Sequence, residues 1–243
     1  MRRSTQFVAF PLLVSFALAA SAAPPAPAST ADNATAVSHP QVKLHTSMGD
    51  IVIELFPDKA PKTVANFLQY VKDGFYDGTV FHRVIPMFLV QGGLYTRQLT
   101  PKRTRPPIPD EANNGLSNLR GTVAAARGPD PDSATAQFFF NIVDNPRLDY
   151  VGNQSGMTWG YAVFGKVVQG MDVVDKLDNL PTGPQGPFIG DVPRPLPVIE
   201  SVKVIGEAAQ PVAEPVSPTA GQVPFAPETK KPKKTPASAS SRH

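Results

Sequence analysis

The hydrophobic positions of this chain are regularly spaced only between residues 42 and 206, where most short segments alternate apolar and polar side chains. A period of two is typical of strands that bury one face. Residues 42–46 and 51–56 lie on either side of Met48-Gly49-Asp50, which predicts a β-hairpin. We expect further strands at residues 79–85, 88–91, 121–126, 137–142, 161–168 and 197–205.

Two segments have a helical period instead. In the segment that begins at Pro61, apolar residues recur at i, i+3, i+4 and i+7, which is one stripe of an α-helix. These residues are Val64, Phe67, Leu68 and Val71. Gly74 follows where a helix commonly ends, and Met171, Val174 and Leu177 predict a second helix. Seven or eight strands with two helices favour a mainly β domain, a closed barrel capped by the helices.

The first 23 residues have the features of a secretory signal peptide. Arg2 and Arg3 precede a short apolar run at residues 7–20, and Ala20-Ser21-Ala22 offers a cleavage site. This run is shorter than the roughly 20 residues of a membrane span. We therefore expect cleavage and export to the periplasm, without stable membrane insertion.

Two further segments have the composition of disordered chain. Residues 24–41 are rich in Ala, Ser and Pro, and residues 207–243 add lysine to these, so we expect a linker and a tail without a core. The domain between them, residues 42–206, holds sixteen basic and sixteen acidic residues, so the net positive charge lies at the ends. A neutral domain gives little support to nucleic-acid binding. The chain has no cysteine, which excludes disulfides, thiol nucleophiles and thiolate metal sites.

The most informative run is FHRVIPMFLVQGG at residues 81–93. Strand alternation predicts one face with Phe81, Arg83 and Ile85, and the opposite face with His82 and Val84. A bulky apolar wall beside a guanidinium suits a neutral, partly apolar ligand.

Beyond the turn at Pro86, Leu89 and Gln91 are also expected to share a face. The amide of Gln91 suits a ligand that has a carbonyl group to be held. The run contains neither a phosphate cradle nor a nucleophile with its base. The four histidines of the chain lack metal-ligand spacing, and Asp130 and Asp132 alone fall short of a calcium loop. We expect no metal and no cofactor.

Several motifs follow one another in order over residues 42–206. They are FHRVIP at 81–86, QGG at 91–93, GTVAAA at 121–126, QFF at 137–139 and VFGKV at 163–167. Together they resemble the cyclophilin family of peptidyl-prolyl cis-trans isomerases, and DSAT at 132–135 with GYAVFG at 160–165 resemble its exported bacterial branch. The resemblance implies a closed eight-stranded antiparallel barrel capped by two α-helices, and an enzyme that acts on X-Pro bonds without a cofactor.

The resemblance also implies roles for single residues. Arg83 would be the catalytic arginine, and Gln91 would hold Arg83 and a substrate carbonyl. The proline pocket would be formed by Phe88, Leu89, Phe139 and Leu148. The surface beside the substrate would be formed by Ala126, Arg127, Gln137 and Tyr161.

Three residues depart from the pattern of the best-studied eukaryotic members. Leu89 stands where Met is usual, Arg127 where Asn is common, and Arg147 where those members carry Trp. The last change removes an aromatic contact expected to bind cyclosporin. We therefore expect weak cyclosporin binding and an intact proline pocket.

Two functions remain open at this point. The first is an isomerase that accelerates rotation of X-Pro bonds in unfolded or folding exported proteins. The second is a chaperone or binding module that holds proline-containing peptides with the same surface and needs no turnover. In either case we expect a monomer whose partners are proline-containing polypeptides.

Overall fold

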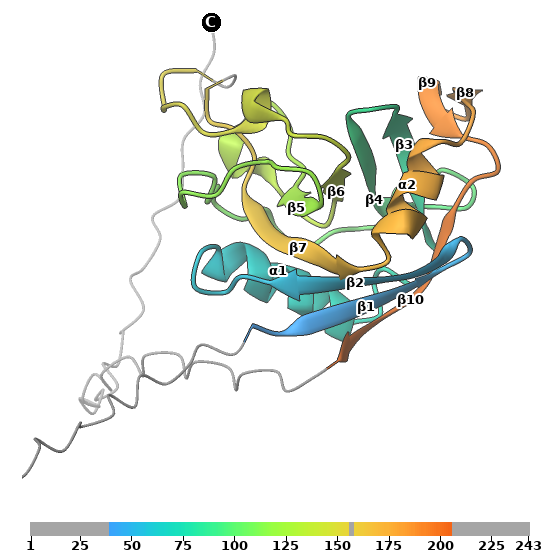
Figure 1. The fold of residues 1–243 in the computed structure, drawn as a ribbon, viewed down its shortest axis with the longest axis horizontal. Coiled ribbons are helices and arrows are strands. Elements are labelled where there is room, and N and C mark those ends of the chain that lie inside the picture. Colours follow the sequence, from blue (N-terminus) through green and yellow to red (C-terminus); the bar gives the residue numbers. More distant parts are fainter. Residues whose placement is uncertain (1–38, 156–157, 206–243) are drawn as a thin grey trace, which may run out of the picture. The chain divides into compact units, whose positions relative to one another are not determined.

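The structure, a computed structural model, describes residues 39–155 and 158–205 of the chain (Figure 1). Eight of its strands form one closed antiparallel barrel in the order β1-β10-β3-β4-β6-β5-β7-β2. The barrel strands are β1 (Gln41–Thr46), β2 (Gly49–Leu55), β3 (Thr79–Ile85), β4 (Leu89–Thr96), β5 (Thr122–Ala125), β6 (Phe138–Asn141), β7 (Val163–Gln169) and β10 (Val198–Ile205). The other elements are α1 (Pro61–Lys72), α2 (Met171–Asp178), β8 (Thr182–Gln185), β9 (Phe188–Pro193) and the short 3-10 helices Pro131–Ser133 and Pro146–Leu148. The expected fold class is confirmed.

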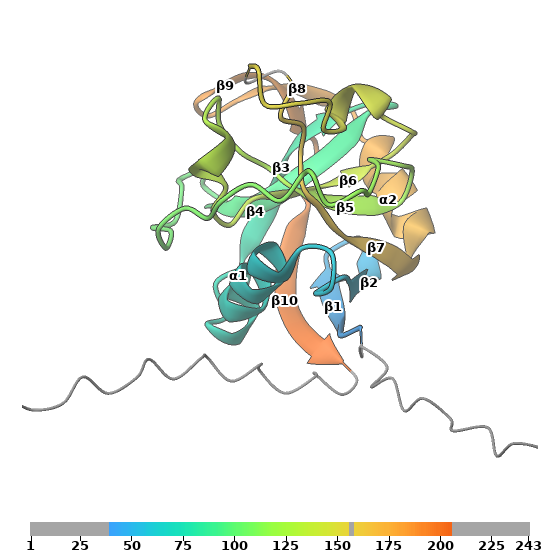
Figure 2. The same cartoon turned by 90° about the vertical axis from the view of Figure 1, so that its left-hand side faces the viewer.

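Alternate residues of β1 and β2 point into the barrel. Val42 and Leu44 of β1 are fully buried, as are Ile51 and Ile53 of β2. The two helices lie at separate places on the barrel, α1 beside β10 and α2 beside β7 in Figure 2. Both add their apolar stripes to the same core, because Val64, Phe67 and Val71 of α1 and Val174 and Leu177 of α2 belong to it.

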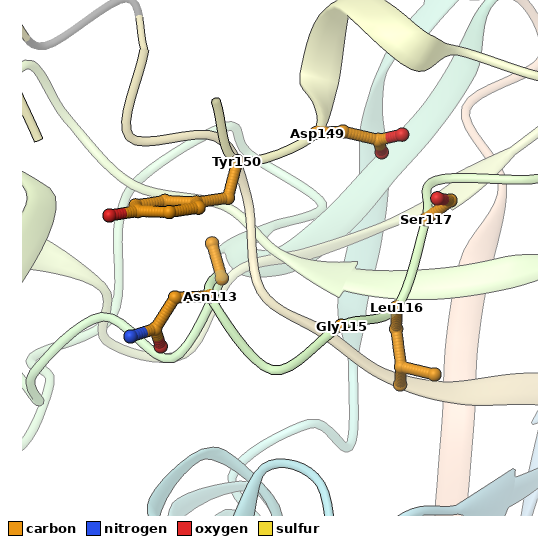
Figure 3. Close-up of a pocket in the computed structure, with 7 residues that line it drawn as sticks. Asn113, Gly115, Leu116, Ser117, Asp149 and Tyr150 are labelled. Carbon is orange, nitrogen blue, oxygen red and sulfur yellow. The ribbon is translucent and has the colours of Figure 1, made fainter. Parts of the chain in front are cut away.

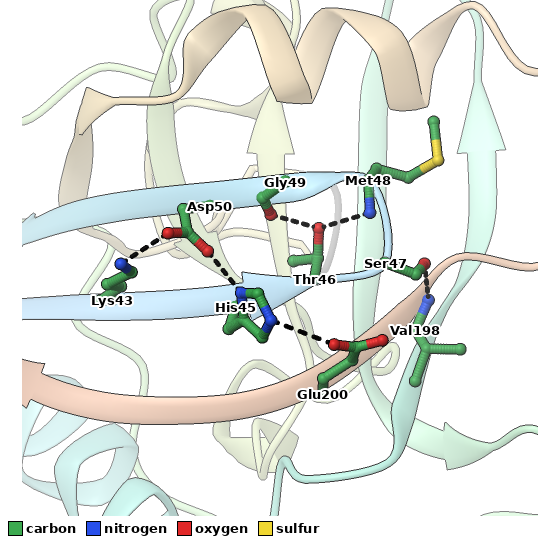
Figure 4. Close-up of polar contacts among 9 residues, drawn as sticks. All are labelled: Lys43, His45, Thr46, Ser47, Met48, Gly49, Asp50, Val198 and Glu200. Carbon is green, nitrogen blue, oxygen red and sulfur yellow. Dashed lines mark hydrogen bonds and ion pairs between the residues drawn. The ribbon is translucent and has the colours of Figure 1, made fainter.

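The hairpin between β1 and β2 is held by side chains around its turn (Figure 4). The Thr46 hydroxyl donates to the Gly49 carbonyl at 2.6 Å and accepts from the Met48 amide at 3.1 Å. Gly49 has a φ of +130°, which disfavours residues with a side chain. Hydrogen bonds from Lys43 and then from His45 lower the pKa of the Asp50 carboxyl. These contacts fix the register at the start of the barrel.

The observed elements differ from the sequence expectation in three places. Strand β4 continues to Thr96, five residues beyond the predicted end. The chain contacts the barrel before β1, since the Pro40 carbonyl accepts from Leu55. The two-stranded sheet β8-β9 was not predicted, because Gly, Pro and polar residues hide the alternation of both strands.

Several expectations fall outside the described residues. These are the signal peptide at residues 1–23, most of the linker that was expected at 24–41, and the tail at 207–243. Within residues 39–155 and 158–205, no helix combines the length and hydrophobicity that a membrane crossing requires.

Candidate active site

A second apolar cluster lies on the outside of the barrel, across β4, β6, β5 and β7. On these strands the residues next to its members, Val90, Phe138, Phe140, Val123 and Phe164, belong to the barrel core. Strand alternation therefore turns the cluster members outward. Its buried members are Leu89, Ala124, Ala126, Phe139 and Val163, and Phe88, Leu116, Leu148 and Tyr161 pack against them. We call these nine residues the outer cluster.

The register of the sheet explains why these residues meet. Phe139 of β6 stands opposite Gln91 of β4 on one side and Ala124 of β5 on the other. Ala124 in turn stands opposite Val163 of β7. The small Ala124 beside Phe139 leaves the phenyl ring as the largest group of this row. Tyr161 closes the cluster edge-on, with ring centroids 5.6 Å apart.

Buried asparagines hold Phe88 and Leu148 of the outer cluster in place. Asn145 donates to the Phe88 carbonyl at 3.0 Å and to the Asn141 side chain at 2.8 Å. Asn118 donates to the Leu148 carbonyl at 2.9 Å and accepts from Asn141 at 3.1 Å. Because buried amides need partners, this chain of three side chains ties both loops to β6. None of these three asparagines was predicted from sequence, where only their polarity inside apolar segments could have indicated them.

A β-bulge in β3 decides where Arg83 points. Phe81 pairs with Gly92 and Arg83 pairs with Gln91, so His82 is an extra residue on β3. Phe81 and Val84 therefore both lie in the barrel core, and Arg83 lies outside it. The prediction that Phe81 shares a face with Arg83 is wrong, and so is the prediction that His82 shares a face with Val84. Strict alternation breaks at a bulge.

His82 itself is buried on the outer side of β3. Its ring packs against Tyr95 and Phe188, with ring centroids at 4.6 and 5.5 Å. The Nδ1 atom is buried without a hydrogen-bond partner. Burial, and then the charge of Arg83, lower the pKa of His82 from 6.5 to about 4. The imidazole is therefore neutral at neutral pH.

Arg83 begins a line of polar side chains along the edge of the outer cluster. Its Nη1 atom donates to Oε1 of Gln91 at 3.4 Å, and Nε2 of Gln91 donates to Oε1 of Gln137 at 3.0 Å. A guanidinium can only donate, so the Gln91 oxygen must face Arg83 and the nitrogen must face Gln137. The amide nitrogen of Gln137 stays available as a donor to a ligand carbonyl.

Arg83 has a second partner that sequence reasoning missed. The Oδ2 atom of Asp191, on β9, lies 3.5 Å from the Nε atom of Arg83. Both side chains are nearly half exposed, at 44% and 48%. No sequence signal indicated this pair, because β9 itself was not predicted.

Arg127 lies at the far end of the outer cluster. Its guanidinium stacks over the Tyr161 ring at 4.8 Å and donates to the Gly160 carbonyl at 2.9 and 2.7 Å. The structure thus brings all ten residues assigned by the resemblance onto one surface: Arg83, Phe88, Leu89, Gln91, Ala126, Arg127, Gln137, Phe139, Leu148 and Tyr161. Arg147, in the 3-10 helix beside Leu148, is exposed.

A separate pocket of about 260 Å³ lies next to the outer cluster (Figure 3). The Tyr150 ring lies on one side with Asn113, and Asp149 lies on the other with Ser117. Leu116 lines this pocket and is also a member of the outer cluster. One oxygen of Asp149 is already used, because it accepts two hydrogen bonds from Asn118. Among the described residues, no three histidine, aspartate or glutamate side chains are grouped as metal ligands.

Comparison with known proteins decides the family. The family model described as "Cyclophilin type peptidyl-prolyl cis-trans isomerase/CLD" matches residues 41–204. The chain belongs to the cyclophilin family. It is therefore an enzyme, a peptidyl-prolyl cis-trans isomerase.

Two bacterial peptidyl-prolyl cis-trans isomerases are similar over about two thirds of the chain. Peptidyl-prolyl cis-trans isomerase B of Escherichia coli (strain K12) is 55% identical over 163 residues, which are 67% of this chain and 98% of that protein. Peptidyl-prolyl cis-trans isomerase A of Dickeya dadantii (strain 3937) is 50% identical over 172 residues, 71% of this chain and 87% of that protein. A Cryptosporidium parvum cyclophilin, crystallised in the presence of the dipeptide Ala-Pro, has a TM-score of 0.57 at 26% identity and covers 69% of this chain and 99% of that one.

Proposed function

We propose that this cyclophilin accelerates X-Pro bond rotation in unfolded or folding exported proteins, without a covalent step, and that Arg83 assists the rotation. The observation that carries the proposal is the position of the Arg83 guanidinium. It stands beside Gln91, and Gln91 lies directly opposite Phe139 of the outer cluster. A proline ring on the outer cluster would have its nitrogen within reach of that cation.

The chemistry requires no acid, base or nucleophile. Resonance between the amide nitrogen and the carbonyl gives a rotation barrier of roughly 18–20 kcal/mol. When the bond twists, the prolyl nitrogen becomes pyramidal and its lone pair can accept a hydrogen bond. Arg83 donates to this lone pair in the twisted state and has little to bind in the planar one. The interaction therefore stabilises the transition state more than the ground state.

The outer cluster and the polar side chains along its edge bind different parts of the substrate. Phe88, Leu89, Phe139 and Leu148 remove the proline ring from water, which strengthens a nearby charge-assisted hydrogen bond. Gln137 and Gln91 hold the flanking carbonyl groups and so fix the direction in which the bond can turn.

The test replaces Arg83. Loss of one preorganised donor costs on the order of 10²–10³ in rate, so Arg83→Ala should lose about 10²-fold or more in kcat/KM while circular dichroism stays unchanged. Arg83→Lys should recover only part of this activity. A lysine restores the positive charge but lacks the planar fork of donors. Arg97→Ala, at an exposed arginine in the turn after β4, is the matched control and should have full activity. Turnover is measured on a short X-Pro peptide in a protease-coupled assay.

The same measurement separates the second candidate function. A folded Arg83→Ala protein with wild-type turnover would remove Arg83 from the mechanism. A wild-type protein that binds X-Pro peptides without any turnover would leave a peptide-binding chaperone.

The proposed clients follow from the amino-terminal segment. Arg2, Arg3 and the apolar run at residues 7–20 support export to the periplasm, where unfolded proteins with X-Pro bonds arrive. Mass spectrometry of the mature protein should find an amino terminus near Ala23. Soluble cytosolic protein that begins at Met1 would contradict export and leave the isomerase mechanism untouched.

A further inference from the structure

The contact between Arg83 and Asp191 joins two irregular points of the fold. Arg83 follows the bulge at His82 in β3. In the β8-β9 sheet, Gly183 pairs with Val192 and Gln185 pairs with Phe188, so β9 has two residues more than β8 between these pairs. Asp191 lies in this irregular part of β9. Bulges re-aim single side chains and are common next to active sites.

The backbone of Asp191 is itself unusual, with a φ of +62°. Aspartate and asparagine enter the left-handed region more readily than other residues with a side chain. This conformation costs free energy within β9, and in it the carboxylate of Asp191 faces Arg83.

Strand β9 is fixed firmly enough to position a side chain. Val192, next to Asp191, is fully buried in a cluster with Val80, Leu99 and Val198. Three residues before Asp191, the Phe188 ring packs against His82 at 5.5 Å. The neighbours His82 and Arg83 on β3 therefore both contact β9, one through packing and one through charge.

We propose that Asp191 is a positioning residue for Arg83. It holds the guanidinium at Nε while Gln91 holds it at Nη1, so the remaining donors, those of Nη2 among them, are directed to the substrate. The inference rests on the proposed catalytic role of Arg83. Without Asp191, a long and half-exposed side chain would sample several rotamers, and only one of them serves the prolyl nitrogen.

The exposure of the two side chains sets the expected loss of activity. An ion pair between half-exposed side chains contributes only a small free energy. Its loss should therefore lower kcat/KM only modestly, by roughly 2- to 5-fold. The loss should fall on kcat, because the outer cluster, which holds the ring, does not include Asp191.

The decisive variant is Asp191→Asn. It removes the charge and keeps a residue that tolerates the left-handed backbone, so folding should be unchanged. The matched control is Asp73→Asn, because Asp73 pairs with Arg105 at 3.4 Å and with similar exposure, 44% and 50%, in a pair that includes no residue of the outer cluster. Asp191→Asn should lower kcat by roughly 2- to 5-fold and Asp73→Asn should not change it.

Turnover is measured for Asp191→Asn in the wild-type and in the Arg83→Ala background, with enzyme concentration raised for the slower proteins. The effect should vanish in the Arg83→Ala background, because Asp191 acts through Arg83. An equal loss in both backgrounds, or no loss in either, would overturn the positioning role. If Arg83→Ala itself keeps full turnover, the proposed mechanism fails first.

A second readout reports on position without turnover. NMR relaxation of the Arg83 Nε–H group should show a more mobile guanidinium in Asp191→Asn than in wild type. A guanidinium that is equally ordered in both proteins would also overturn the proposal.

Discussion

Acid should destabilise this protein through one buried histidine, His82. The side chain is 3% exposed, its Nδ1 atom has no partner, and its pKa is lowered from 6.5 to about 4. In the unfolded chain His82 takes up a proton near pH 6.5, and in the folded protein only near pH 4. As pH falls from 6.5 to 4, the unfolded state therefore binds a proton that the folded state refuses, and stability decreases.

The magnitude follows from the two pKa values. Each unit of difference corresponds to about 1.4 kcal/mol, so the full loss is about 3 kcal/mol. Between pH 7 and pH 5 the same relation gives a loss of about 2 kcal/mol. Carboxylates of an unfolded chain take up most of their protons below this interval, and the remaining groups cancel when wild type is compared with a variant that lacks His82.

The assay is urea unfolding of wild type and His82→Phe at pH 7, 6 and 5. Phenylalanine keeps a flat ring between Tyr95 and Phe188 and has no proton to bind. The free energy of unfolding of wild type should fall by about 2 kcal/mol more than that of His82→Phe over this interval. An NMR titration should find His82 neutral at pH 5. Parallel pH profiles of the two proteins, or an imidazole that is charged at pH 5, would refute the reasoning.

Two further predictions concern the outer cluster and its rim. Phe139→Ala should raise KM more than it lowers kcat, because it removes the largest wall of the proposed proline pocket; it should also cost about 3–5 kcal/mol of stability, so urea unfolding must accompany the steady-state kinetics. Arg147→Trp should tighten cyclosporin binding, measured by calorimetry, with little change in turnover, and wild type that already binds as tightly as the variant would contradict the role given to Arg147.

The barrel could be predicted from sequence because strand alternation is a local property, whereas the roles of the site residues came from the resemblance. Phe138, Phe139 and Phe140 show this well. Their order alone implies that the middle ring faces away from its neighbours, and the structure buries the outer two inside the barrel and Phe139 outside it. The catalytic role of Arg83 came from the resemblance and stays a prediction.

Alternation failed where an extra residue enters a strand. Nothing in the run from Phe81 to Ile85 marks His82 as a bulge, since the insertion is defined only by pairing with β4. Asp191 was missed for a similar reason. Its strand pairs with the Gly- and Pro-containing β8, and its partner Arg83 is more than a hundred positions earlier, so only the folded chain brings the two charges together.

The pairing of β1 with β10 has a consequence for how the barrel folds. Gln41, the first residue of β1, stands opposite Ile205, the last residue of β10. These two residues are far apart in the sequence, so closing the loop between them is entropically costly. Long-range pairing of this kind is slow to form during folding. Until β10 is in place, β1 and β3 have unpaired edges, which invite pairing between molecules. A protein with this topology is exposed to aggregation until its last strand has paired with both neighbours.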